Sequence, residues 1–139
     1  MKKAATTAVI LVSLFCATAQ AEQQSYRCSA TKNTVNHILH IKIDGDKLGA
    51  WTYIAATPGG DSSTTCSVAS TDGRETDSVG VQSYSTSAGK VTVTKTGDSF
   101  VFDFSSLEIS QVCGQSSAMA KHITITPGSK RCTNVANAT

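Results

Sequence analysis

The chain has 139 residues, of which 40% are hydrophobic, and its formal net charge is +2. Two of its twelve basic residues are Lys2 and Lys3, and without them ten basic residues face ten acidic ones. The main part of the chain is therefore near neutral, so its charge predicts neither a nucleic-acid partner nor an anionic membrane surface.

The first 21 residues have the pattern of a secretory signal peptide. Lys2 and Lys3 form a charged start, Ala8–Ala17 is a short apolar stretch, and Ala19–Ala21 is a small-x-small cleavage site. The apolar stretch is about ten residues long, half of what a membrane-spanning helix needs, and no later segment is long and apolar enough to span. We expect cleavage after Ala21 and a periplasmic or secreted protein with no membrane span.

Cys16 raises the alternative of a lipoprotein signal, in which a cysteine becomes acylated. The bulky Phe15 directly before Cys16 fits that signal poorly. We therefore favour a protein without a lipid anchor, and lipidation of Cys16 stays the alternative.

The segment after the signal, residues 22–139, has the size of one ordinary domain. It contains four cysteines: Cys28, Cys66, Cys113 and Cys132. An even number of cysteines in an exported chain predicts two disulfides, and the spacing contains no Cys-x-x-Cys pair that would indicate zinc or a redox motif. Three pairings are possible. We lean weakly to Cys28 with Cys66 and Cys113 with Cys132.

Alternation of apolar and polar residues with period two predicts antiparallel strands along this domain. The predicted strands cover Val35–Ile43, Leu48–Ala55, Ser63–Ala69, Thr76–Tyr84, the segment from Val91 to the turn at 95–98, the segment from Phe100 to Ser105, and a last strand around Ile123 and Ile125. Leu107–Val112 is compatible with a strand or a short helical turn. The sequence therefore predicts an all-β fold, a small antiparallel meander of about eight strands that forms a disulfide-stapled barrel or sandwich.

Aromatic residues recur on the predicted strands. Trp51 and Tyr53 share one face of their strand, and Phe100, Phe102 and Phe104 share one face of a later strand. Such a stripe is usually core, so we expect these side chains to be buried. The alternative is that they line a ligand cavity inside a barrel.

No residue pattern predicts catalysis, a metal site or a cofactor. His37 and His40 are three positions apart on a strand and point to opposite faces, which makes a shared metal awkward. The Gly-Asp-Ser sequences at 60–62 and 97–99 lack the strand-to-helix context of a nucleophilic serine. We expect a protein that is not an enzyme.

The polar segment Ser83–Lys90 is rich in hydroxyl groups and ends in a glycine and a cation. We expect an exposed loop over Ser85–Gly89, because loops that present polar groups often bind partners. The simpler alternative is a polar turn without a function.

Tyr26-Arg27-Cys28, Ser87-Ala88-Gly89-Lys90 and Thr94-Lys95-Thr96-Gly97 together resemble the bacterial inhibitors of c-type lysozyme. In that family an eight-stranded barrel inserts a loop into the lysozyme cleft, where a serine meets the catalytic carboxylates and a lysine adds a contact. The resemblance implies partner contacts at Ser85, Ser87, Gly89, Lys90 and Lys95. The family loop usually has Ser-Gly-x-x-Tyr, whereas this chain has Ser-Ala-Gly-Lys-Val at 87–91.

Two other functions fit the same sequence. A lipocalin-like barrel would bind a small ligand among the aromatic residues. A structural or adhesive envelope protein of unknown partner is compatible with all the patterns above.

Overall fold

The computed structural model describes residues 22–59, 65–113 and 118–137. The signal segment, Cys16 and the start of the predicted Ser63–Ala69 strand lie outside the described residues. The described chain forms two antiparallel sheets. The four-stranded sheet contains β1 (Gln23–Lys32), β2 (Val35–Asp44), β3 (Lys47–Ala56) and β4 (Thr65–Ala69). The six-stranded sheet contains β5 (Gly73–Ser78), β6 (Val81–Thr86), β7 (Gly89–Thr96), β8 (Ser99–Leu107), β9 (Ala120–Ile125) and β10 (Thr133–Asn137).

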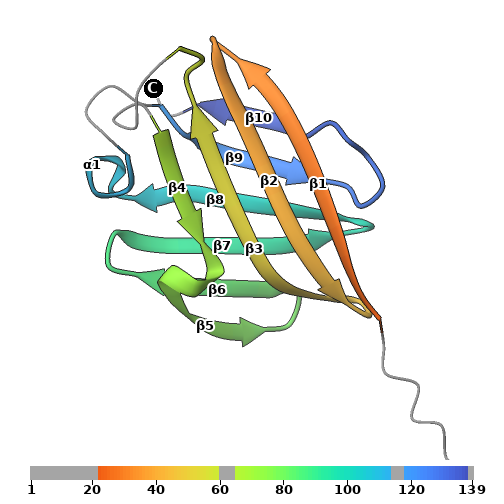
Figure 1. The fold of residues 1–139 in the computed structure, drawn as a ribbon. Helices are drawn as coiled ribbons and strands as arrows, with labels where there is room; N and C mark the ends of the chain where they lie inside the picture. Colours follow the sequence, from red (N-terminus) through yellow and green to blue (C-terminus); the bar gives the residue numbers. More distant parts are fainter. Residues whose placement is uncertain (1–21, 60–64, 114–117, 138–139) are drawn as a thin grey trace, which may run out of the picture.

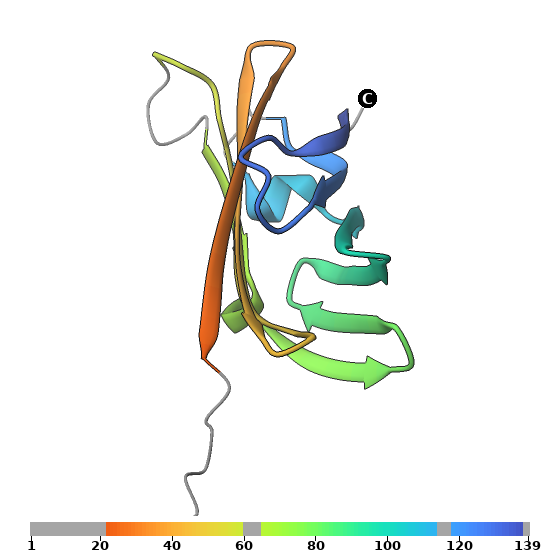
Figure 2. The same ribbon diagram turned by 90° about the vertical axis from the view of Figure 1, so that its right-hand side faces the viewer.

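Strands that are neighbours in sequence are neighbours in each sheet, in the orders β1-β2-β3-β4 and β10-β9-β8-β7-β6-β5. The four-stranded sheet lies in front in Figure 1, and its strands run steeply across those of the sheet behind it. Figure 2 shows the two sheets as separate layers. The predicted all-β meander is confirmed, and the arrangement is a sandwich of ten strands rather than a closed barrel.

The core lies between the two layers and is aromatic. Trp51 and Tyr53 from β3 are buried against Phe102 and Phe104 from β8. Ring centroids are 5.3 Å apart for Trp51 and Phe102, and 4.7 Å apart for Tyr53 and Phe104. Phe100 is also buried. The predicted burial of the phenylalanine face is therefore confirmed, and these rings fill the interlayer space by packing on one another.

The predicted single strand over Thr76–Tyr84 is wrong. The chain turns at Val79 and Gly80, which separate β5 from β6, and Gly80 has a φ of 73°. Val79 is fully exposed at this turn and contributes nothing to the core. The cause is the glycine, whose left-handed conformation closes a two-residue hairpin turn at little steric cost.

Two strands were not predicted, β1 and β10. In β1 only Cys28 is fully buried and eight of the ten residues are polar, because this strand forms an edge of its sheet. The short β10, in which three of five residues are polar, forms an edge of the other sheet. Edge strands bury little side-chain area, so the alternation that reveals inner strands is weak in them.

Helical structure is limited to two short pieces in the described part of the chain. They are a single turn, η2 (Ser70–Asp72), between β4 and β5, and the four-residue helix α1 (Ile109–Val112) after β8. The ambiguous segment Leu107–Val112 thus combines the end of a strand with a helical turn. In the described residues, we find no helix with the length and hydropathy that crossing a bilayer requires.

Both predicted disulfides are present, but the favoured pairing is wrong. Cys28 is bonded to Cys132 and Cys66 to Cys113, with Cα atoms 4.9 and 4.2 Å apart. Cys28 on β1 and Cys66 on β4 are three strand spacings apart in one sheet, which is about 14 Å and beyond the reach of a disulfide. The observed bridges link different parts of the sandwich, and two disulfides are typical of an oxidising compartment.

Candidate functional site

The segment that was expected to be a long loop is the tight end of a hairpin. β6 ends at Thr86 and β7 begins at Gly89, so only Ser87 and Ala88 form the turn. Thr86 Oγ1 donates to the Gly89 carbonyl at 2.9 Å and accepts from the Ala88 amide at 3.1 Å. The correction has a simple reason: strands with one face in water use the same hydroxyl-bearing residues as loops do.

Gly89 fixes this turn against the neighbouring strand. Its φ is 130°, and a Cβ at this position would lie 2.2 Å from the carbonyl oxygen of Ser106 on β8. The Glu108 amide donates to the Ala88 carbonyl at 2.7 Å on the same side. The turn is therefore anchored to two strands and to the segment after β8, which makes it a rigid projection.

Four of the five residues that the resemblance implied lie together at this end of the sheet. Ser85 on β6 is directly opposite Lys90 on β7, and both are exposed. Ser87 is exposed at the turn itself, and Gly89 joins it to β7. The hydroxyl groups of two serines and the ammonium of Lys90 thus occupy one tip of the sandwich, which we call the β6–β7 tip.

The fifth residue, Lys95, lies at the opposite end of β7. Five residues of strand separate it from Lys90, a distance of about 16 Å. In Figure 1 the turn between β6 and β7 is on the left, and the turn between β7 and β8 is on the right. Lys95 Nζ is 3.4 Å from the Asp46 carbonyl oxygen and 4.0 Å from Asp46 Oδ1. The structure therefore does not bring Lys95 together with Ser87.

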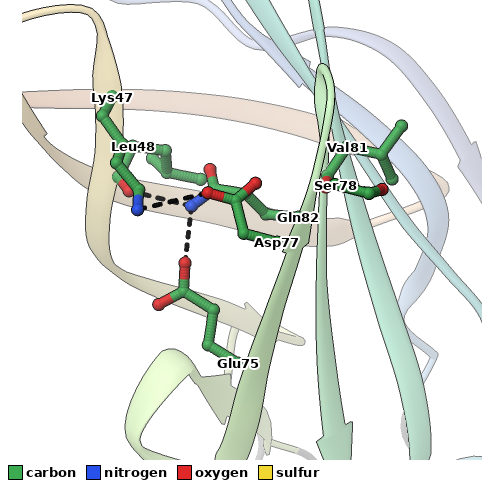
Figure 3. A network of polar contacts seen from close by, with 7 residues as sticks. All are labelled: Lys47, Leu48, Glu75, Asp77, Ser78, Val81 and Gln82. Atoms are coloured by element: carbon green, nitrogen blue, oxygen red, sulfur yellow. Dashed lines mark hydrogen bonds and ion pairs between the residues drawn. The ribbon is translucent and has the colours of Figure 1, made fainter.

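The surroundings of Lys95 form a polar junction between the sheets, part of which Figure 3 shows. Gln82 on β6 is buried, and its Nε2 donates to the Leu48 carbonyl at 3.1 Å and to Glu75 Oε1 at 2.7 Å. Lys47 Nζ lies 3.2 Å from Asp77 Oδ2. These contacts tie the start of β3 to β5 and β6. The sequence did not reveal Gln82, because its partners come from distant segments.

A hollow of about 310 Å³ opens at this junction, with Asp44, Asp46 and Asp77 among its lining residues. Lys47 and Lys95 also line it, so cations accompany the carboxylates. Within the residues that the structure describes, no three histidine, cysteine or acidic side chains are arranged to hold a metal ion. The junction is best interpreted as a structural contact.

Histidines 37 and 40 point to opposite faces of β2, as predicted: His37 is buried and His40 is exposed. His37 Nδ1 is 2.8 Å from the Tyr53 hydroxyl, which accepts the Ala120 amide at 2.7 Å. Which of the two groups donates in the His37–Tyr53 hydrogen bond depends on the histidine tautomer, and His37 Nε2 is buried without a hydrogen-bond partner among the described residues. Burial, assisted by the charge of Lys32, lowers the pKa of His37. Burial raises the pKa of Tyr53 well above its usual range.

A cluster of Asp103, Ser105 and His122 was missed in the sequence. Ser105 Oγ donates to Asp103 Oδ1 at 2.5 Å, and His122 Nδ1 lies 3.6 Å from the same oxygen. Burial acts to raise the pKa of Asp103, but the hydroxyl and amide of Ser105 and the nearby His122 together lower it below its usual value. In a hydrolytic triad the histidine must contact the serine, whereas here the serine contacts the carboxylate. The cluster therefore lacks the contact that would activate a nucleophile.

The aromatic residues considered as a cavity lining pack on one another instead. Tyr53, Phe102 and Phe104 are 2% exposed or less. Phe102 and Phe104 lie 6.0 Å apart between ring centroids. Phe100 is among the lining residues of the hollow at the polar junction, whereas Tyr53, Phe102 and Phe104 line neither that hollow nor the one beside the β6–β7 tip. This packing is what a plain core requires.

Comparison of the chain with protein-family models, curated proteins and solved structures finds no match.

Proposed function

We propose that the chain is an exported, non-catalytic inhibitor of c-type lysozyme and that its β6–β7 tip enters the partner's cleft. The observation that carries this proposal is the anchored two-residue turn, which holds the exposed Ser87 beside Ser85 and Lys90. This function requires a protein in the periplasm or outside the cell. The two disulfides support this location, because such bonds persist in oxidising compartments.

The chemistry of the tip suits a cleft that contains carboxylates. A c-type lysozyme works with one protonated and one ionised carboxyl group. A serine hydroxyl can donate to or accept from these groups, and a lysine ammonium can pair with the ionised one. Blocking the cleft inhibits the enzyme without any reaction by the inhibitor.

The rigidity of the tip supports the same function. Thr86 and Gly89 fix the turn from within, and the Glu108 amide fixes it from outside. A turn that is already ordered loses little conformational entropy when it binds, so more of the contact energy appears as affinity.

Two acidic residues lie beside the tip, which itself carries the cation Lys90. Asp72 and Ser87 line a hollow of about 350 Å³ beside the turn. Glu108 is exposed at the segment that bonds to Ala88. Acidic groups that flank the tip would steer a basic lysozyme toward it.

The proposal assigns the cationic contact to Lys90 and not to Lys95. Lys90 is exposed opposite Ser85, whereas Lys95 is at the other end of β7 beside Asp46. A partner cleft that receives Ser87 therefore reaches Lys90 before any residue of the opposite end.

The test measures lysis of a peptidoglycan suspension by c-type lysozyme with the purified protein in excess. Ser87→Ala and Lys90→Ala should each weaken inhibition about thirtyfold, because a charge-assisted contact in a closed cleft contributes about 2 kcal/mol. The matched controls Thr96→Ala and Lys95→Ala, at the far end of β7, should inhibit like the wild type.

Two results would overturn the proposal in different ways. Full lysozyme activity with micromolar wild-type protein would refute inhibition itself. Inhibition that is lost in Lys95→Ala and kept in Lys90→Ala would refute the β6–β7 tip as the contact and move the interface to the polar junction.

A further inference from the structure

The outer face of the four-stranded sheet, which faces the viewer in Figure 1, carries a group of basic side chains without a described role. Arg27 on β1 and His40 and Lys42 on β2 are all exposed and line a hollow of about 280 Å³. The hydroxyl-bearing Ser25 and Thr52 complete its polar lining.

The strand register brings these side chains together. Arg27 is directly opposite His40, so their Cβ atoms are about 5 Å apart. Lys42 is two residues from His40 on the same face, about 7 Å along the strand. Ser25 is opposite Lys42, and Thr52 is opposite His40 on the other side. Three different nitrogen donors thus surround one small area with a hydroxyl on either side.

A bulge between β2 and β3 opens the hollow. Ile41 pairs with Trp51 but Ile43 pairs with Leu48, so Lys42 faces two residues, Gly49 and Ala50. An extra residue bends the strand and redirects the facing side chain, and such bulges are common beside binding sites. Gly49 and Ala50 carry almost no side chain, so they contribute little bulk beside Lys42.

The hollow is one-sided in charge. None of its lining residues is acidic, and Arg27, His40 and Lys42 form no ion pair with any residue that the structure describes. Arg131, also exposed, forms a β-bridge with Ser29 on β1 but is not among the lining residues of the hollow. Like charges on one face repel each other, and an anion between them removes that cost.

We infer that this hollow is a binding site for a phosphate monoester carried by a soluble ligand. A phosphate monoester has nearly two negative charges and three terminal oxygens, which match the three nitrogen donors. A volume of about 280 Å³ is just below the usual range for whole small-molecule ligands, so the hollow receives a group rather than a molecule. Among the described residues, the large hydrophobic side chain that is fully exposed is Val79. It lies at the β5–β6 turn of the other sheet, away from this hollow. Tyr26, Ile41 and Trp51 also line the hollow, but Ile41 and Trp51 are buried and only Tyr26 is partly exposed, so this face offers little apolar side chain for insertion into a lipid surface.

The test is a titration of the full protein with inorganic phosphate at low ionic strength, followed by backbone amide NMR shifts. Sodium chloride at the same ionic strength is the reference, because exposed charges are screened by any salt. Saturable shifts should centre on Arg27, His40 and Lys42. Arg27→Gln and Lys42→Gln should each weaken binding about tenfold, whereas the matched control Lys130→Gln, an exposed cation outside the hollow, should bind within about twofold of the wild type.

A second variant and a second probe complete the design. Ala50→Glu places a carboxylate at the floor of the hollow and should abolish phosphate binding without removing any donor. The inference is overturned if chloride produces the same shifts as phosphate, or if Lys130→Gln weakens binding as much as Lys42→Gln. It is also overturned if the protein binds phosphatidylglycerol vesicles but not phosphate, which would make the face a lipid contact. Lysozyme inhibition by Arg27→Gln should equal that of the wild type, so this site and the β6–β7 tip can fail separately.

Discussion

Replacing Gly89 with alanine should destabilise the fold far more than a typical glycine substitution. The new Cβ would lie 2.2 Å from the Ser106 carbonyl oxygen, and the φ of 130° is one that side chains rarely adopt. Backbone strain of this kind costs about 1–3 kcal/mol. Relief of the clash requires β7 to move from β8, which breaks backbone hydrogen bonds that contribute about 1 kcal/mol each. We expect a total loss of about 3–5 kcal/mol.

Gly97→Ala is the matched control for this prediction. Gly97 also has a positive φ, 59°, but a Cβ there would have no neighbour within 4 Å. Only the left-handed conformation is penalised, at about 1–2 kcal/mol. Urea unfolding measures both free energies. If Gly97→Ala and Gly89→Ala destabilise the protein equally, the contact with Ser106 does not constrain the turn, and our argument for a rigid tip is wrong.

Three further predictions concern the core, pH and the disulfides. Phe102→Ala should lower the free energy of unfolding by about 3–5 kcal/mol, and an unchanged melting temperature would show that this ring is not core. The pKa of His37 is lowered from 6.5 in the folded protein, so between the two pKa values the unfolded chain binds a proton at His37 and the folded chain does not. The free energy of unfolding should therefore be highest above about pH 6.5. Below that pH it should fall, by at most about 1.4 kcal/mol per pH unit. A His37→Phe variant should lose that slope in urea midpoints measured between about pH 7.5 and pH 5. Replacing both Cys28 and Cys132 by alanine should lower the free energy of unfolding by up to about 5 kcal/mol, because their bridge spans 104 residues. Peptide mapping without reduction should recover the peptides that contain Cys28 and Cys132 as a disulfide-linked pair.

The sequence predicted best where one strand face is buried and the other is not. The alternation of Phe100, Phe102 and Phe104 indicated a buried strand face because aromatic side chains of a soluble sheet must leave water. The same logic failed at Val79, where an apolar residue beside a glycine forms a turn instead of continuing a strand. Short-range pattern alone does not distinguish these two situations.

The candidate site was predicted in composition but not in shape. The hydroxyl-rich residues from Ser83 to Gly89 look the same in a loop and on the outer face of a strand, so the hairpin was mistaken for a loop. Lys95 lies apart from Ser87 because the length of β7 separates them, which follows from the strand itself. The disulfide pairing depends on which strands lie side by side, which no local pattern encodes.

The strict sequential order of the strands has a consequence for how the protein folds. Every hydrogen-bonded pair of strands within a sheet joins consecutive segments, so each sheet can assemble hairpin by hairpin with small loop-closure costs. Contacts across the sandwich and the Cys28–Cys132 link join segments that are distant in sequence. The native thiols of this pair meet only when the segment that precedes β10 has reached the edge of β1, where Ser29 bonds to Lys130 and Cys132. Formation of the Cys28–Cys132 disulfide therefore indicates that the two layers have docked. Once formed, the disulfide makes the docking hard to reverse.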